Sequence, residues 1–258
     1  MSPFGRGAWG VFGAASAAFL LAPLVLVVFF SFGENAHATF PVGGFTVKWY
    51  EALLESPEFW AALENSAIVT LSVGALSAVI GTLAAFGFAR VRARSANLAM
   101  TTLTFPIMLP PLVLALALAT SYSSLGVPMG VHTVIPSHLV FTQPFVILIV
   151  YAHMANFDYA IIESARDLGA SPLRIFWTVT LPIIRPTLIG ATLIAMSISL
   201  DDFVITFFTI GGGMTLPTLV WGMLRTSLDP SINALGAFIL ATTIGSSMIA
   251  LKVTQYRG

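Results

Sequence analysis

Two acidic residues lie inside a long apolar run in the C-terminal third of the chain. Asp201 and Asp202 interrupt an otherwise uncharged stretch from about Thr187 to Thr209. A carboxylate in such a run is costly in a membrane, so it normally faces a cavity, a partner or a transport pathway. Carboxylates bind ammonium groups, and apolar or aromatic walls cover the methylenes between them. We therefore predict that this pair attracts a cationic solute.

The helical face around Asp202 carries small and polar side chains. Steps of three and four residues place on one stripe Thr192, Ala195, Ser199, Asp202, Thr206 and Thr209. Bulky apolar side chains fall on a different face: Leu193, Met196, Leu200, Phe203 and Phe207. We interpret the small stripe, with Asp201 at its edge, as the lining of a substrate pathway. Two other interpretations stay open, namely a structural acid bonded to a neighbouring helix and a gate at the outer mouth.

The four histidines do not suggest a metal site. His37, His132, His138 and His153 show no metal-ligand spacing on a shared helix face. We therefore predict no metal site and interpret each histidine as a polar loop or packing residue.

The composition identifies the elements that must position these residues. Of 258 residues, 57% are hydrophobic and 9% are charged, whereas about 25% are charged in ordinary soluble domains. This excludes a soluble globular protein, and zero net charge argues against nucleic-acid binding. Long apolar runs rather than alternating segments predict an all-α, polytopic membrane protein, with one domain over residues 1–258. Its six predicted spans are 7–33, 65–89, about 97–120, 134–155, about 187–209 and 230–251.

The positions of the basic residues predict the orientation. Six spans place both termini on one side of the membrane, and that side receives nine of the 11 Lys and Arg residues. The other side receives only Lys48 and Arg225. Since cytoplasmic loops carry the basic excess, both termini are predicted to be cytoplasmic.

A patterned cytoplasmic loop, 158–186, connects the fourth and fifth spans. A helix is predicted from Tyr159 to Leu168, Gly169 suits a left-handed turn, and Ser171 with Pro172 suits the start of a second helix. The first helix is predicted to be amphipathic, with apolar Ile162, Ala165 and Leu168 apart from charged Glu163, Arg166 and Asp167. Such a helix inserts into a groove on another protein or lies on the membrane surface, and the pattern alone favours neither.

This loop resembles the EAA motif of bacterial ABC importer permeases. Glu163-Ser164-Ala165 is followed by three residues, Gly169, nine residues and then Val179-Thr180-Leu181-Pro182. Segments 197–208, 215–217 and 229–235 are similar to the second permease subunit of spermidine/putrescine importers, and the resemblance runs from about Trp49 to the sixth span. It implies that an ATPase contact is formed by Glu163, Ser164, Ala165, Asp167 and Gly169.

The resemblance also implies a type I ABC importer permease fold, a bacterial inner-membrane location and a set of partners. These partners are a second homologous permease subunit, two cytoplasmic ATPase subunits, a periplasmic solute-binding protein and membrane lipid. The chain itself is expected to be a transport subunit, not an enzyme, and to hold no cofactor. It is not predicted to be the ATPase, because Lys48 and Lys252 are not followed by Ser or Thr as a phosphate-binding loop requires. ATP would be bound by the partners. The alternatives are a permease for another small organic solute and a stand-alone carrier with Asp201 and Asp202 as its coupling-ion site.

Overall fold

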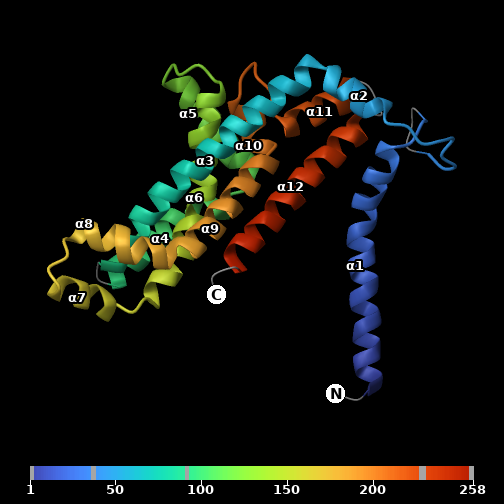
Figure 1. Cartoon of the computed structure of the whole chain (residues 1–258). Coiled ribbons are helices and arrows are strands. Elements are labelled where there is room, and N and C mark those ends of the chain that lie inside the picture. The colour runs from blue at the N-terminus through green and yellow to red at the C-terminus, as the bar shows by residue number, and fades with distance from the viewer. Residues whose placement is uncertain (1–2, 36–38, 91–92, 227–230, 256–258) are drawn as a thin grey trace. The chain divides into compact units, whose positions relative to one another are not determined.

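The regular structure of the chain is helical. The computed structural model describes residues 3–35, 39–90, 93–226 and 231–255, and over these residues it contains no strand. The helices (Figure 1) are α1 Pro3–Ser31, α2 Lys48–Glu55, α3 Pro57–Arg90, α4 Ala93–Met108, α5 Pro111–Ser124, α6 Val131–Ala155, α7 Ala160–Asp167, α8 Pro172–Ile175, α9 Leu181–Asp201, α10 Val204–Thr209, α11 Leu216–Thr226 and α12 Ser231–Gln255. A π-helical turn, Phe176–Thr180, joins α8 to α9.

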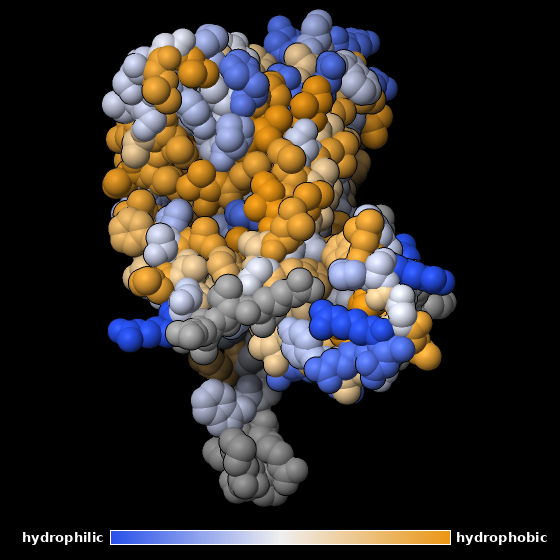
Figure 2. Space-filling model, turned by 90° about the vertical axis from the view of Figure 1, so that its left-hand side faces the viewer, coloured by the Kyte–Doolittle hydropathy of each residue, from blue (hydrophilic) through white to orange (hydrophobic). Residues whose placement is uncertain are grey.

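Most predicted spans correspond to long apolar helices. Within the described residues, α1, α3, α6 and the continuous run from α8 through α9 are each long and apolar enough to cross a membrane. The bent pair α4–α5 forms a fifth candidate, and α12 carries a shorter apolar stretch at Ser231–Ser246. The predicted start of the sixth span, Pro230, lies outside the described residues. Figure 2 shows hydrophobic side chains gathered in a broad band across one face, with hydrophilic side chains beyond it at both ends.

The third predicted span is bent sharply. The segment from about 97 to 120 was predicted to be one span, but α4 ends at Met108 and α5 begins at Pro111, with an angle of 99° between them. Pro110 is extended, with φ −54° and ψ 132°. A proline lacks the N–H that would continue the helix and disfavours helical geometry in the residue before it, so consecutive prolines end one helix and start another.

The chain divides into two compact units. One comprises residues 1–60 and 219–242, and the other comprises 61–218 and 243–258. In the first unit, the Trp49 indole N–H donates to the Gly33 carbonyl at 2.7 Å, and the Phe59 ring packs edge-on against Phe238. The second unit contains the predicted pathway acids and the 158–186 loop, so it positions the candidate sites.

Close helix packing holds the second unit together. A Cβ added at Gly74 of α3 would lie 2.6 Å from Cγ of Met196 on α9, and one added at Gly81 would lie 2.6 Å from Cγ1 of Val146 on α6. No larger residue fits at either position without moving its neighbour. These two glycines therefore allow α3 to approach both α6 and α9, which is how small residues act in membrane helix packing.

Candidate functional site

The 158–186 loop has the predicted helix–turn–helix form. Asp158 Oδ1 accepts the Ala160 N–H at 3.0 Å at the start of α7, and Gly169, two residues beyond the end of α7, adopts φ +82°. Ser171 Oγ accepts the Arg174 N–H at 3.4 Å, with Pro172 in the first position of α8. The predicted glycine turn and the predicted cap of the second helix are confirmed. In Figure 1, α7 and α8 lie at the opposite end of α6 from the turn that joins it to α5.

The loop presents most of its predicted contact residues to the surface. Glu163, Ser164, Asp167 and Gly169 are exposed, whereas Ala165 is half-buried against the apolar core. The predicted apolar face is wrong in one respect. Leu168 is 89% exposed, because α7 ends at Asp167 and Leu168 follows the last turn instead of continuing its inner face.

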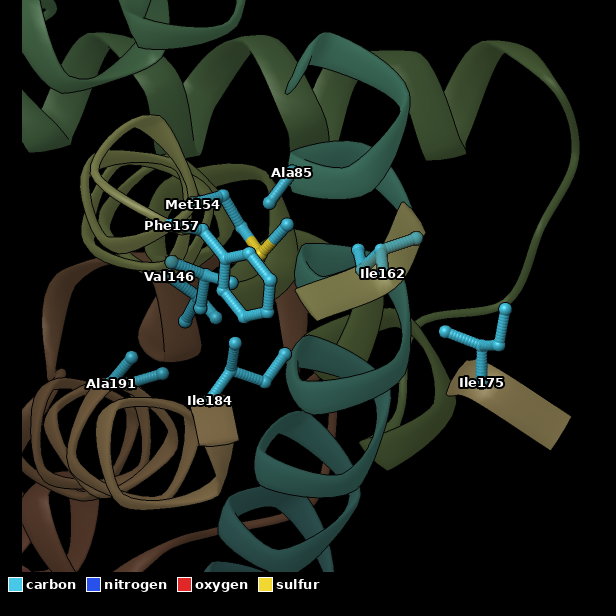
Figure 3. Close-up of a cluster of buried hydrophobic side chains, with 10 residues drawn as sticks. Ala85, Val146, Met154, Phe157, Ile162, Ile175, Ile184 and Ala191 are labelled. Carbon is cyan, nitrogen blue, oxygen red and sulfur yellow. The ribbon is translucent and has the colours of Figure 1, made fainter. Parts of the chain in front are cut away.

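An apolar cluster fixes this loop to the membrane helices. Ile162 of α7 and Ile175 of α8 are buried in one cluster with residues of α3, α6 and α9. Figure 3 shows Met154, Phe157 and Ile184 converging at the centre of this cluster. Burial of aliphatic side chains of this size stabilises the fold by roughly 1.5–3 kcal/mol per side chain. The loop is therefore a packed extension of the helices and not a free connector.

The second candidate site lies at a break in the fifth predicted span. The expected continuous helix over 187–209 is wrong, since α9 ends at Asp201 and α10 starts at Val204. Asp202 is extended, with ψ 113°, and its Oδ2 accepts the backbone N–H groups of Ile205 at 3.0 Å and Thr206 at 3.2 Å. A short acidic side chain competes with the helix for these N–H groups, so Asp202 ends α9 and caps α10.

A buried histidine from α6 completes this site. His138 Nδ1 lies 2.8 Å from Ser199 Oγ, and Nε2 lies 2.9 Å from Thr206 Oγ1. Nε2 is also 3.3 Å from Asp202 Oδ2. The His138 side chain is 2% exposed and that of Asp202 is 16% exposed. We call His138, Ser199, Asp202 and Thr206 the polar cluster.

The structure brings three of the four predicted pathway residues together and separates the fourth. Ser199, Asp202 and Thr206 meet around His138, whereas Asp201 is exposed. The small stripe is not open along its length, because Ala195 and Thr209 are fully buried and Ser199 and Thr206 nearly so. In this conformation α6 covers the stripe. This geometry matches the alternative of an acid bonded to a neighbouring helix, and the pathway role remains a prediction.

The sequence interpretation missed the partnership of His138. A packing role was predicted for it, and the ring is indeed buried, but it is also bonded to two other helices. One signal was available: α6 carries its own polar stripe, Thr133, Ser137, His138 and Thr142, within an apolar run. Polar side chains on neighbouring spans form hydrogen bonds with each other, because lipid tails offer no hydrogen-bond partner. His37 lies outside the described residues.

Comparison with known proteins identifies the family. The family model described as "Binding-protein-dependent transport system inner membrane component" matches residues 77–255. The putrescine transport system permease protein PotI of Escherichia coli (strain K12) is 34% identical over 230 residues, covering 86% of this chain and 82% of that protein. The spermidine/putrescine transport system permease protein PotC of the same strain is 30% identical over 258 residues, covering 97% of each.

A solved structure confirms the fold. A chain of a bacterial ABC transporter involved in the import of the acidic polysaccharide alginate superposes with a TM-score of 0.70 at 18% identity, covering 100% of this chain and 98% of that one. The all-α membrane protein predicted from the apolar runs and the permease fold implied by the resemblance are therefore confirmed. With the family match over most of its length, the chain belongs to the inner-membrane permease components of binding-protein-dependent ABC transporters.

Proposed function

We propose that this chain is a permease subunit of an ABC importer that carries polyamines of the spermidine/putrescine type across the bacterial inner membrane. The observation that carries the proposal is its similarity, at 30–34% identity over most of its length, to two permeases named for these solutes. In the assembled importer it pairs with a second permease subunit, two cytoplasmic ATPase subunits and a periplasmic solute-binding protein. ATP is bound and hydrolysed by the ATPase subunits, and this chain needs no cofactor.

The acids at the helix break supply the chemistry for a cationic solute. Asp201 is exposed and Asp202 is partly exposed, so both carboxylates are available to ammonium groups when the pathway opens. The exposed ring of Phe207 lies one turn further along and offers an apolar surface for methylenes. Ser199 and Thr206 complete the pathway face, and Asp201 attracts the solute to it.

The 158–186 loop transmits the movement of the ATPase subunits. Glu163, Ser164, Asp167 and Gly169 are exposed on it, beside the exposed apolar side chains of Leu168 and Leu173, and Ala165 anchors the same helix to the core. An exposed leucine flanked by charged residues suits a cleft on another protein. Because Ile162 and Ile175 pack among the membrane helices, a push on the loop moves these helices together. With this contact the loop would be cytoplasmic, and six spans would then put both termini on the same side, as the distribution of basic residues also predicts.

The test is solute-stimulated ATP hydrolysis and uptake by the complex reconstituted into vesicles. The complex is assayed with putrescine, spermidine, neutral amino acids and sugars, with the binding protein present. We expect stimulation and ATP-dependent uptake with the polyamines alone. Stimulation by another solute instead would reject the polyamine assignment. Uptake by the isolated chain, driven by an ion gradient without an ATPase subunit, would reject the importer altogether.

A further inference from the structure

One imidazole connects the two helices on either side of the α9–α10 break. Ser199 lies in the last turn of α9 and Thr206 lies in α10, and His138 of α6 bonds to both side chains through its two ring nitrogens. Only Asp202 and Phe203 separate the two helices along the chain. The angle between α9 and α10 therefore depends on the imidazole of His138, which belongs to a third helix, α6.

The position of the ring proton follows from the neighbours of His138. An ionised carboxylate only accepts hydrogen bonds, and Asp202 Oδ2 lies 3.3 Å from Nε2. A lone pair on Nε2 would lie close to the negative charge of Asp202, whereas a proton there is donated to Thr206 Oγ1 at 2.9 Å and lies favourably near the carboxylate. A ring that carries a proton on Nε2 therefore fits these neighbours, with the Ser199 hydroxyl as the partner of Nδ1.

Helix α10 is fastened to α6 at both of its ends. At its C-terminal end the Thr133 hydroxyl of α6 donates to the Thr209 carbonyl at 2.7 Å. At its N-terminal end the polar cluster makes the second connection. The apolar side of α10 packs on α5, where Ile205 is buried with Leu114 and Ala115. Thus α10 is held as part of the α5–α6 assembly and is joined to α9 through the break.

We propose that His138 is a positioning residue for transport. It directs the Asp202 carboxylate and holds both sides of the α9–α10 break against α6, through Ser199 on one side and Thr206 on the other. Since this role rests on the proposed function, in which Asp202 meets the transported cation, its test includes one measurement that requires no transport.

The test is a double-mutant cycle in the assembled, reconstituted complex. Uptake rates are measured against solute concentration for His138→Leu, Asp202→Asn and the double variant. We expect His138→Leu to lower the maximal rate about tenfold, as for the loss of buried hydrogen bonds, here those to Ser199 and Thr206, together with the contact to the Asp202 carboxylate. The loss in the double variant should be smaller than the product of the two single losses, because part of the effect of His138 acts through Asp202. The remainder comes from the bonds of His138 to Ser199 and Thr206, which do not involve the carboxylate. Effects that multiply in the double variant, or wild-type uptake by His138→Leu, would overturn the proposal.

A matched control lies on the same helix. His153 is also on α6, and its Nδ1 lies 3.0 Å from Thr187 Oγ1 of α9, so His153→Leu removes an imidazole contact between the same two helices. Its effect should multiply with that of Asp202→Asn. His138→Gln keeps an N–H donor near the Nε2 position and should recover most of the uptake, whereas His138→Asn is too short to reach Asp202. Equal uptake by the Gln and Asn variants would contradict a role through Nε2.

Hydrogen exchange provides the measurement that needs no transport. The Ile205 and Thr206 amides donate to Asp202, so their exchange in the substrate-free complex reports directly on the carboxylate. We expect about tenfold faster exchange in His138→Leu and no change in His153→Leu. If the wild-type complex takes up no polyamine, the proposed function is rejected. Hydrogen exchange alone then decides whether His138 positions the Asp202 carboxylate. Unchanged protection of these two amides in His138→Leu would then reject the positioning role.

Discussion

The two halves of α6 hold their neighbours by different kinds of contact. Towards the 158–186 loop, its buried side chains are apolar: Val146, Ile147, Val150 and Met154. Towards the other end most of them are polar, namely Thr133, Ser137, His138 and Thr142, with Val134 as an apolar exception. Val146, Val150 and Met154 of the first set pack into the cluster that anchors the loop, and the second set contains the ring that spans the α9–α10 break.

The two ends of α6 therefore differ in what holds them: apolar packing at the loop end and hydrogen bonds at the other end. The free energy gained by burying apolar side chains has no preferred direction. The stability of the packing at the loop end of α6 therefore depends on how completely the side chains fill the available volume. Hydrogen bonds have preferred directions, and a buried group that loses its partner keeps its full desolvation cost. Substitutions at the loop end should therefore act through stability and coupling, whereas substitutions at the break should act through geometry and charge.

The largest expected effect is at the apolar end. Ile162→Ala removes a side chain that is 7% exposed and should destabilise the loop against the core by about 2–5 kcal/mol. The neighbouring Ile161 is 43% exposed, so Ile161→Ala is a matched control with little effect. The heat-induced unfolding midpoint and the ratio of solute uptake to ATP hydrolysis should fall for Ile162→Ala alone. Equal losses in both variants would show that the cluster does not anchor the loop.

The glycine turn of the loop should give the next largest effect. Gly169 has φ +82° and Gly126 has φ +67°, and a Cβ at either position meets no atom within 4 Å. Both Gly→Ala variants therefore carry only backbone strain, about 1–2 kcal/mol. We expect Gly169→Ala to lower uptake per ATP hydrolysed, and Gly126→Ala, in the turn before α6, to leave that ratio unchanged. A loss of coupling in both variants would indicate general destabilisation.

Asp202 offers the smallest and most selective effect, because its cap and its charge can be separated. Asp202→Ala loses the cap of α10, which should cost about 1 kcal/mol and lower the unfolding midpoint. Asp202→Asn keeps an oxygen that accepts the Ile205 and Thr206 N–H groups, so its midpoint should stay near that of the wild type while polyamine uptake falls. Unchanged uptake by Asp202→Asn would contradict the pathway role of the charge and leave only the cap.

Local patterns in the sequence predicted the loop well. The turn at Gly169 and the cap at Ser171 depend on residues within four positions of one another, and the chemistry that favours them is independent of the rest of the fold. The exposed position of Leu168 was missed, because it depends on α7 ending one residue earlier than the periodicity suggested. The long apolar runs predicted the helices for the same local reason.

The helix break and the polar cluster could not be predicted in the same way. A helical stripe assumes an unbroken helix, and Asp202 ends that helix by taking two backbone N–H groups for itself. His138 is separated from Ser199 by 61 residues and from Thr206 by 68. Their meeting depends on which spans pack together, and that depends on long-range contacts such as those of Gly74 and Gly81.

The π-helical turn between α8 and α9 has a consequence for how the loop is aimed. The Leu181 N–H bonds to the Phe176 carbonyl, five residues back, so this turn holds one residue more than an α-helical turn. Each added residue rotates the helix on the N-terminal side of the turn by about 100° relative to the helix on its C-terminal side. Deleting a single residue there would yield an unbroken α-helix and rotate α8, with the loop before it, by about 100° around the axis of α9. The number of residues in this one turn therefore sets the direction in which the 158–186 loop projects from the membrane helices.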